Sequence, residues 1–132
     1  MKFHHLGIIV KKINPTLPSL KKIFNIKKTS KIFIDKKWNV KIIFLHLSKN
    51  VIFEIIEPLN KRSPISKALK KNINVLNHVA FTCNNFDRDK KNIIKNGAIA
   101  VTDAIEAIAF KKKKIQFFLT KENFLVELIK EK

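Results

Sequence analysis

Two histidines and two glutamates stand in the sequence at matched distances. The positions of His5 and His78 differ by 73, as do those of Glu54 and Glu127, and the spacing from each histidine to its glutamate is 49. All four lie in apolar, β-rich runs, where an ionised carboxylate costs on the order of several kcal/mol unless it is paired or metal-bound. Two imidazoles and two carboxylates form a mixed nitrogen–oxygen ligand set, which predicts a site for a divalent transition metal.

A purely structural explanation of these four residues stays open. A duplicated module repeats its residues whether or not they function. A histidine in a strand is often a satisfied core residue, and a glutamate in a strand often lies on a solvated face. The matched offsets of all four residues, each in an apolar run, favour the metal site.

The same offset extends beyond these positions and defines an internal repeat. The segment HLGIIV at 5–10 falls on HVAFTC at 78–83, and VIFEII at 51–56 falls on FLVELI at 124–129. Both pairs match without gaps. We therefore expect two copies of one module, and the four candidate ligands converge if the copies pair about a pseudo-twofold axis.

Each copy predicts a strand, a helix and three further strands, which is a βαβββ module. We expect the chain to divide into module one at 1–58, a linker with a short helix from Ser63-Pro64 at 59–73, and module two at 74–132. In module one the expected elements are a strand at 3–11, a helix at 15–25 and strands at 31–35, 39–48 and 51–57. In module two they are a strand at 76–83, a helix at 86–96 closed by Gly97, and strands at 99–103, 113–120 and 123–130.

Strand alternation predicts which neighbours share a face with the ligands. His5 falls on one face with Gly7 and Ile9, and His4 falls on the opposite face, where packing or exposure explains it. The face of His4 also carries residues that we expect to pack under the helix. Three further acidic residues are expected to be exposed: Asp35, Glu57 and Asp103.

Composition narrows the function classes. The net charge of +18 suggests a nucleic-acid-binding protein, but Arg62 and Arg88 are the only arginines and the lysines are scattered. A coding bias toward A and T produces the same mixture, so we expect no specific nucleic acid, although an acidic ligand would be attracted. The sequence shows no apolar run of about 18 residues and no signal-peptide pattern, and a single cysteine, Cys83, suits the cytoplasm.

At these residues the chain resembles the vicinal-oxygen-chelate (glyoxalase/bleomycin resistance/dioxygenase) superfamily, most closely its methylmalonyl-CoA epimerase and lactoylglutathione lyase branches. The resemblance covers nearly the whole chain. It is carried in order by HHLGIIV (4–10), IFEIIEPL (52–59), SPISKALKKN (63–72), LNHVAFTC (76–83) and FLVELI (124–129). It implies an α+β fold in which two βαβββ modules form a curved mixed sheet cup with helices on the outside.

The resemblance also implies a divalent metal ion (Co, Ni, Zn, Mn or Mg) held by His5, Glu54, His78 and Glu127. The implied reaction is proton transfer next to a carbonyl, with Glu127 as the first choice for the base and Glu54 as its counterpart on the other face. We expect an epimerase of a methylmalonyl-CoA-like thioester. Two alternatives stay open: a glyoxalase I-like lactoylglutathione lyase, and a non-catalytic small-molecule-binding protein of the same fold.

Other residues are candidates for substrate binding. His46 could line the pocket and Trp38 could cap it, although ordinary burial or packing also explains both. Phe110 and Phe117 could form a lid or wall over the substrate. Arg62 and the run that begins at Lys111 could bind the phosphates of an acyl-CoA or another acidic thioester, with a solvated charge run as the default explanation. We expect a homodimer, because strongly curved sheets with exposed edges are often covered by a partner.

Overall fold

The computed structural model describes residues 1–71 and 75–131, and these divide into two compact units. Unit 1 contains Met1–His5 and His78–Lys132, and unit 2 contains Leu6–Asn77. The predicted boundary between linker and module two, at 73 and 74, lies outside the described residues, as do the end of the SPISKALKKN segment at 72 and the last residue of the chain, 132.

The elements follow the predicted βαβββ order in both copies. In each copy, two short strands stand where one strand was predicted after the helix. The first copy contains β1 (Lys2–Ile9), α1 (Ile13–Ile23), β2 (Lys28–Thr29), β3 (Phe33–Asp35), β4 (Val40–His46) and β5 (Ile52–Pro58). The second contains β6 (Val75–Cys83), α3 (Phe86–Lys95), β7 (Ile99–Ala100), β8 (Ile105–Ala107), the 3₁₀ turn η1 (Ile108–Phe110), β9 (Lys113–Leu119) and β10 (Leu125–Lys130). The short helix α2 (Ser66–Leu69) lies between them.

The long elements reproduce the sequence repeat without any slip. Four of them begin at the repeat offset from their counterparts, with starts at Lys2 and Val75, Ile13 and Phe86, Val40 and Lys113, and Ile52 and Leu125. The short strands occur in the same order in both copies, but their starting residues do not differ by the repeat offset. The repeat therefore holds where strands and helices are long enough for hydrophobic patterning to fix them.

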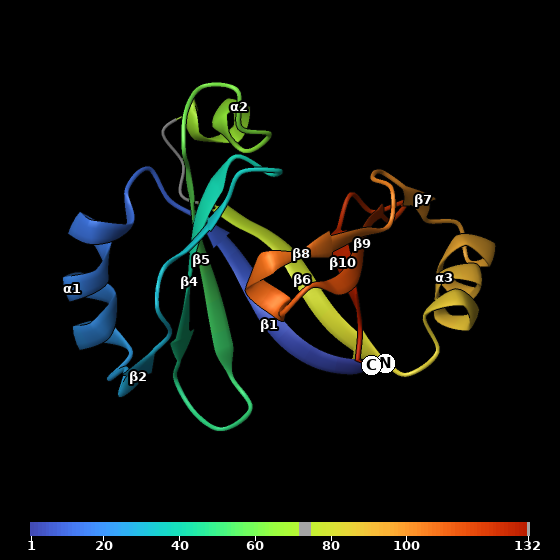
Figure 1. Cartoon of the computed structure of the whole chain (residues 1–132), viewed down its shortest axis with the longest axis horizontal. Coiled ribbons are helices and arrows are strands. Elements are labelled where there is room, and N and C mark those ends of the chain that lie inside the picture. Colours follow the sequence, from blue (N-terminus) through green and yellow to red (C-terminus); the bar gives the residue numbers. More distant parts are fainter. Residues whose placement is uncertain (72–74, 132) are drawn as a thin grey trace. The chain divides into compact units, whose positions relative to one another are not determined.

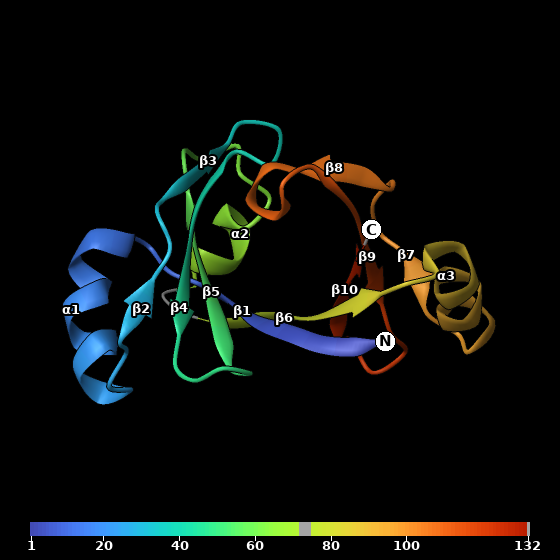
Figure 2. The same cartoon turned by 60° about the horizontal axis from the view of Figure 1, so that its bottom comes forward.

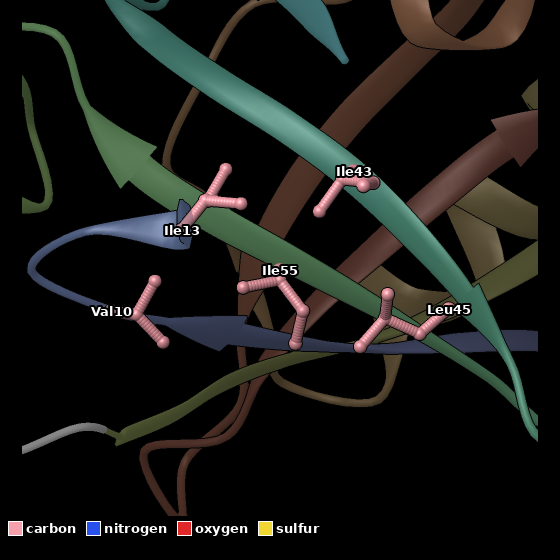
Figure 3. Close-up of a cluster of buried hydrophobic side chains, with 5 residues drawn as sticks. All are labelled: Val10, Ile13, Ile43, Leu45 and Ile55. Carbon is pink, nitrogen blue, oxygen red and sulfur yellow. The ribbon is translucent and has the colours of Figure 1, made fainter. Parts of the chain in front are cut away.

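Unit 2 is a sheet with one helix packed on it. Its strand order is β2–β4–β5–β1, with β3 also paired to β4; β4 and β5 are antiparallel, and β1 and β5 are parallel. The helix α1 lies beside these strands and contacts β5 (Figure 1). The core between them consists of Val10, Ile13, Ile43, Leu45 and Ile55, and Figure 3 shows Ile55 in the middle of this cluster.

Unit 1 repeats this plan with the second copy. Its strand order is β6–β10–β9–β7, with β8 paired to β9; β6 and β10 are parallel, and β10 and β9 are antiparallel. The helix α3 lies beside these strands and contacts β10 (Figure 2). The core under this helix consists of Cys83, Phe86, Ala98, Phe118 and Leu128. Parallel and antiparallel pairing with few helices makes the fold α+β, as the sequence predicts.

Several local predictions were wrong. The first helix begins at Ile13, two residues before the predicted start, and the linker helix begins at Ser66 rather than after Ser63. Ser63 does not cap that helix, because the chain first makes tight turns in which Ser63 N–H donates to the Asn60 carbonyl. Neither the two-residue strand β2 nor the three-residue strand β8 was predicted, since so few residues carry no usable periodicity.

Two carboxylates expected to be exposed are buried. Asp35 is 2% exposed and accepts hydrogen bonds from the backbone N–H groups of Lys37 and Trp38. Its side chain therefore stabilises the turn before β4. Glu57 is 4% exposed and accepts a hydrogen bond from the Ile13 N–H at the start of α1. Polar partners offset the cost of burial in both cases.

Two ionisable groups away from the ligands have shifted pKa values. Burial acts to raise the pKa of Glu57, but the Ile13 N–H and the ammonium of Lys12 outweigh it and hold the pKa below its ordinary value. Burial, aided by the charge of Asp89, raises the pKa of the Cys83 thiol, which therefore stays protonated at neutral pH. Among the described residues, no helix is long and apolar enough to cross a membrane.

Candidate metal centre

Three of the four predicted ligands come together inside unit 1. His5 lies on β1, His78 on β6 and Glu127 on β10, and their exposed fractions are 0%, 3% and 1%. The parallel register of β10 and β6 sets Glu127 beside Ala80, which shares a strand face with His78. Sheet register thus brings a carboxylate from one strand next to an imidazole from its neighbour.

The ligand atoms of these residues form a tight triangle. The Nε2 atoms of His5 and His78 are 3.0 Å apart, and Glu127 Oε2 lies 3.3 Å from the former and 3.4 Å from the latter. Ligands held at about 2.1 Å from one ion are separated by about 3.0 Å at right angles and about 3.4 Å at tetrahedral angles. The observed separations fall in this range, so the donor set fits a divalent ion in both size and chemistry.

Two phenylalanines predicted to line the pocket lie against the imidazoles. The ring of Phe110 stacks on His5, with the centroids 5.7 Å apart and the planes 17° apart. Phe117 meets His78 edge-on at 5.2 Å, and it stands opposite Glu127 in the β9–β10 register. Aromatic rings therefore cover two of the three ligands and limit the access of water to them.

His4 packs against neighbouring rings, one of its two expected explanations, but its contact with His5 was not predicted from alternation. Its Nδ1 lies 2.8 Å from the Nδ1 of His5, and its ring meets Phe110 edge-on at 5.6 Å. Alternation fixes the direction of the Cα–Cβ bond, but the imidazole extends further and can turn back to its neighbour. The adjacent pair of histidines was the signal in the sequence that could have revealed this contact.

The fourth predicted ligand, Glu54, lies in unit 2 and is 3% exposed. On β5 it pairs with Gly7 of β1 and with Phe44 of β4. Gly7 is two residues from His5 along the same strand, so the two residues share a strand face. His46, at the end of β4, is half-buried and pairs with Ile52, which puts it on the same face of the sheet as Glu54.

The other predicted substrate-binding residues lie in turns and loops. Trp38 is half-buried in the turn between β3 and β4, in unit 2. Arg62 is exposed, also in unit 2, and its backbone N–H donates to the side chain of Asn60. Lys111 is exposed in unit 1 and ends η1 in a left-handed conformation with a φ of 54°. Among the described residues, none of these three supplies a ligand atom to the cluster of histidines and glutamates, and their role in substrate binding stays a prediction.

Two βαβββ copies with parallel and antiparallel strands define a class of duplicated α+β proteins, and unit 1 buries an imidazole–imidazole–carboxylate triangle. A sequence model of the glyoxalase/bleomycin resistance protein/dioxygenase superfamily matches residues 4–117. The chain belongs to this superfamily, as its motifs indicate. The search of curated proteins finds no match to the sequence.

Solved structures share this fold over almost the whole chain. A hypothetical protein from Bacillus halodurans is 23% identical, with 99% of this chain and 94% of that chain covered and a TM-score of 0.87. Methylmalonyl-CoA epimerase from Mycobacterium tuberculosis is 18% identical, with 98% and 87% covered and a TM-score of 0.84. A variant of the Streptomyces coelicolor methylmalonyl-CoA epimerase, in complex with 2-nitronate-propionyl-CoA, is 20% identical, with 98% and 94% covered and a TM-score of 0.84. At these identities the likeness shows the fold.

Proposed function

We propose that the protein is a metal-dependent epimerase that moves a proton next to the carbonyl of an acyl-CoA-type thioester. The observation that carries the proposal is the buried triangle of His5, His78 and Glu127, with its ligand atoms 3.0 to 3.4 Å apart. The likeness of the fold to methylmalonyl-CoA epimerases supports this choice of reaction class.

Glu54 is the proposed fourth ligand. Three observations support it: it is the repeat counterpart of Glu127, it is buried on an apolar strand, and it pairs with Gly7, which shares the strand face of His5. Gly7 has no side chain to occupy the space beside Glu54. A carboxylate oxygen beside two imidazole nitrogens is also a donor that divalent transition metals accept.

A divalent ion bound there would act as a Lewis acid for the thioester carbonyl and stabilise the negative charge that develops on its oxygen. Glu127 removes the proton from the α-carbon, so that the C–H electron pair moves into the enolate. Glu54 returns a proton to the opposite face of that carbon, and in the protonated state that this step requires it does not serve as the fourth ligand. The product has inverted configuration, Glu127 holds the proton, and the two carboxyl groups are ready for the reverse reaction.

The substrate side of the site is proposed from the remaining predicted residues. Phe110 and Phe117 already flank the imidazoles and would exclude water from the reacting carbon. His46 and Trp38, both half-buried, would complete the apolar wall. Lys111 and Arg62 are exposed cations suited to the phosphates of a CoA tail. A homodimer is also proposed, because Ile99 on the edge strand β7 is 62% exposed.

Exchange of the α-hydrogen for deuterium tests this function directly. Metal-loaded protein in D₂O should incorporate deuterium at the α-carbon of methylmalonyl-CoA, and Glu127→Gln should slow the exchange by about 10²- to 10⁴-fold, the usual contribution of a general base. Glu122→Gln is the matched control, since Glu122 is an exposed glutamate in the turn that leads to β10. It should exchange at the wild-type rate.

Loaded protein that leaves the thioester unexchanged would contradict the epimerase proposal. The same samples should then be assayed with the hemithioacetal of glutathione and methylglyoxal, the substrate class of the lactoylglutathione lyase branch. Turnover in that assay would assign the site to isomerisation of a glutathione adduct. If Glu127→Gln exchanged the α-hydrogen at the wild-type rate, Glu127 would not be the base.

A further inference from the structure

We propose that His4 is a positioning residue that holds the imidazole of His5 in the orientation and tautomer needed to bind the metal ion. The inference rests on the proposed metal site and concerns a residue that is not itself a ligand. His4 lies one residue before His5 on β1, is half-buried, and contacts Nδ1 of His5, whereas Nε2 of His5 faces His78 and Glu127.

The two ring nitrogens of His5 have different partners. Its Nε2 faces the Nε2 of His78 at 3.0 Å and Glu127 Oε2 at 3.3 Å, and its Nδ1 faces the Nδ1 of His4 at 2.8 Å. A nitrogen that ligates a metal must offer its lone pair, so the proton of neutral His5 belongs on Nδ1. His5 Nδ1–H then donates to the Nδ1 of His4, which accepts and carries its own proton on Nε2.

This hydrogen bond corresponds to the support that metal-binding histidines generally have. Such residues donate their second ring N–H to a carboxylate, a carbonyl or water, and the bond fixes both tautomer and ring orientation. Here an imidazole nitrogen takes the place of the oxygen acceptor. At 2.8 Å the bond has ordinary length, and the His5 ring is fully buried. Loss of the acceptor would leave a buried donor unsatisfied, which is unfavourable.

The ring of Phe110 contacts the imidazoles of both His4 and His5. It stacks on His5 with 17° between the planes and meets His4 edge-on with 81° between the planes. The hydrogen bond sets the rotation of the His5 ring within its plane, and the stacking sets the plane itself. Removal of the acceptor should therefore weaken metal binding even where the stacking is kept.

The repeat suggests a variant that keeps the acceptor. Asn77 occupies the position in the second copy that is equivalent to His4, immediately before His78. The side-chain oxygen of asparagine can accept a hydrogen bond close to the position of a histidine Nδ1. His4→Asn thus keeps an acceptor, and His4→Phe removes it while keeping a ring against Phe110. His46→Phe is the matched control, being the same change at the other half-buried histidine.

The experiment is titration with Co²⁺, followed by calorimetry and by the visible absorption of the bound ion. His4→Phe should bind Co²⁺ about 10- to 100-fold more weakly than wild type, with an altered spectrum, and His4→Asn should stay near wild type. His46→Phe should bind Co²⁺ with the affinity of the wild type, because His46 is not a proposed metal ligand. Imidazole ¹⁵N NMR of the loaded protein should show the His5 proton on Nδ1. If His4→Phe does not fold, His4→Ala, which also lacks the acceptor, takes its place.

The outcomes separate the two proposals. Wild-type protein that binds no Co²⁺ overturns the metal site and, with it, the role of His4. Wild-type binding that His4→Phe leaves unchanged in affinity and spectrum overturns the role of His4 alone. Equal weakening in His4→Asn and His4→Phe would also contradict it, since the retained acceptor would then have had no effect.

Discussion

The candidate ligand residues could be picked out in the sequence because they break the pattern of the strands that hold them. A charged or polar side chain in an apolar strand needs a partner, and four such residues at a common offset indicate a shared one. His5, His78 and Glu127 do lie together, with their Nε2 and Oε2 atoms within 3.4 Å. The contact of His4 was not predicted, because strand alternation describes the backbone and not the reach of an imidazole.

Lys112 is strained in a way that sequence alone does not show. It has a φ of 62°, and its repeat counterpart Asn39 has a φ of 58°, so the turn requires a left-handed residue in both copies. Asparagine tolerates this conformation better than lysine does. We predict that Lys112→Gly raises the free energy of unfolding by about 0.5–1 kcal/mol, measured by urea denaturation.

Lys114→Gly is the matched control for this prediction. Lys114 is exposed in the extended strand β9, where glycine should lower the free energy of unfolding by about 0.5–1 kcal/mol. Two variants that change stability in the same direction would show that the backbone of Lys112 is not strained.

At the scale of elements, the two copies cap their first helix differently. At the start of α3 the side chain of Asn85 accepts from the Arg88 N–H, with Asp87 and Asp89 in the first turn. Within the described residues, α1 has neither a capping side chain at Lys12 nor an acidic residue in its first turn. A carboxylate from β5 provides the cap instead, since Glu57 Oε2 accepts from the Ile13 N–H at 2.9 Å.

Glu57→Gln should therefore destabilise the fold. In the variant a neutral amide oxygen takes the place of the carboxylate oxygen that accepts from the Ile13 N–H, and the ion pair with Lys12 Nζ at 3.0 Å is lost, which together should cost about 1–1.5 kcal/mol at pH 7. The measurement is the free energy of unfolding in urea. Glu106→Gln, at an exposed position of β8, is the control and should change stability by less than about 0.5 kcal/mol.

The effect of Glu57 should also depend on pH in one direction. Its pKa is lowered in the folded state, so its stabilisation is fully present above the ordinary pKa of about 4.3 and is lost as the pH falls through the lowered value. The difference between wild type and Glu57→Gln should be constant from about pH 6 to 8 and shrink below about pH 4. A difference that grows in acid would contradict the cap.

The length of an element decides whether the sequence predicts it. The strands β4, β5, β9 and β10 and the helices α1 and α3 carry enough apolar positions to show a period. All six were predicted as elements of the right type, although α1 begins two residues before its predicted start. The strands β2, β7 and β8 have two or three residues and are defined by their pairing with β4 or β9. The cap from Glu57 could not be predicted, because it joins residues far apart in the chain.

For the whole molecule, the ungapped repeat was the strongest indication of the fold class. Two copies that each bury one helix against one sheet make an α+β protein, and the superfamily match and the solved structures agree. The net charge of +18 was less informative, since the lysines are spread along the chain and most of those described are exposed. Such a charge attracts acidic ligands at long range but does not indicate where on the protein they bind.

We propose that His5, His78 and Glu127 hold one divalent ion. The most direct test is the metal content of purified protein after loading with Co²⁺ and removal of the excess, measured by mass spectrometry for wild type and single variants. We predict one ion per chain in wild type and in His46→Ala, and a loss of bound metal in His5→Ala and in His78→Ala. Wild-type protein without metal, or stoichiometric metal in His5→Ala and His78→Ala, would show that these residues do not hold the ion.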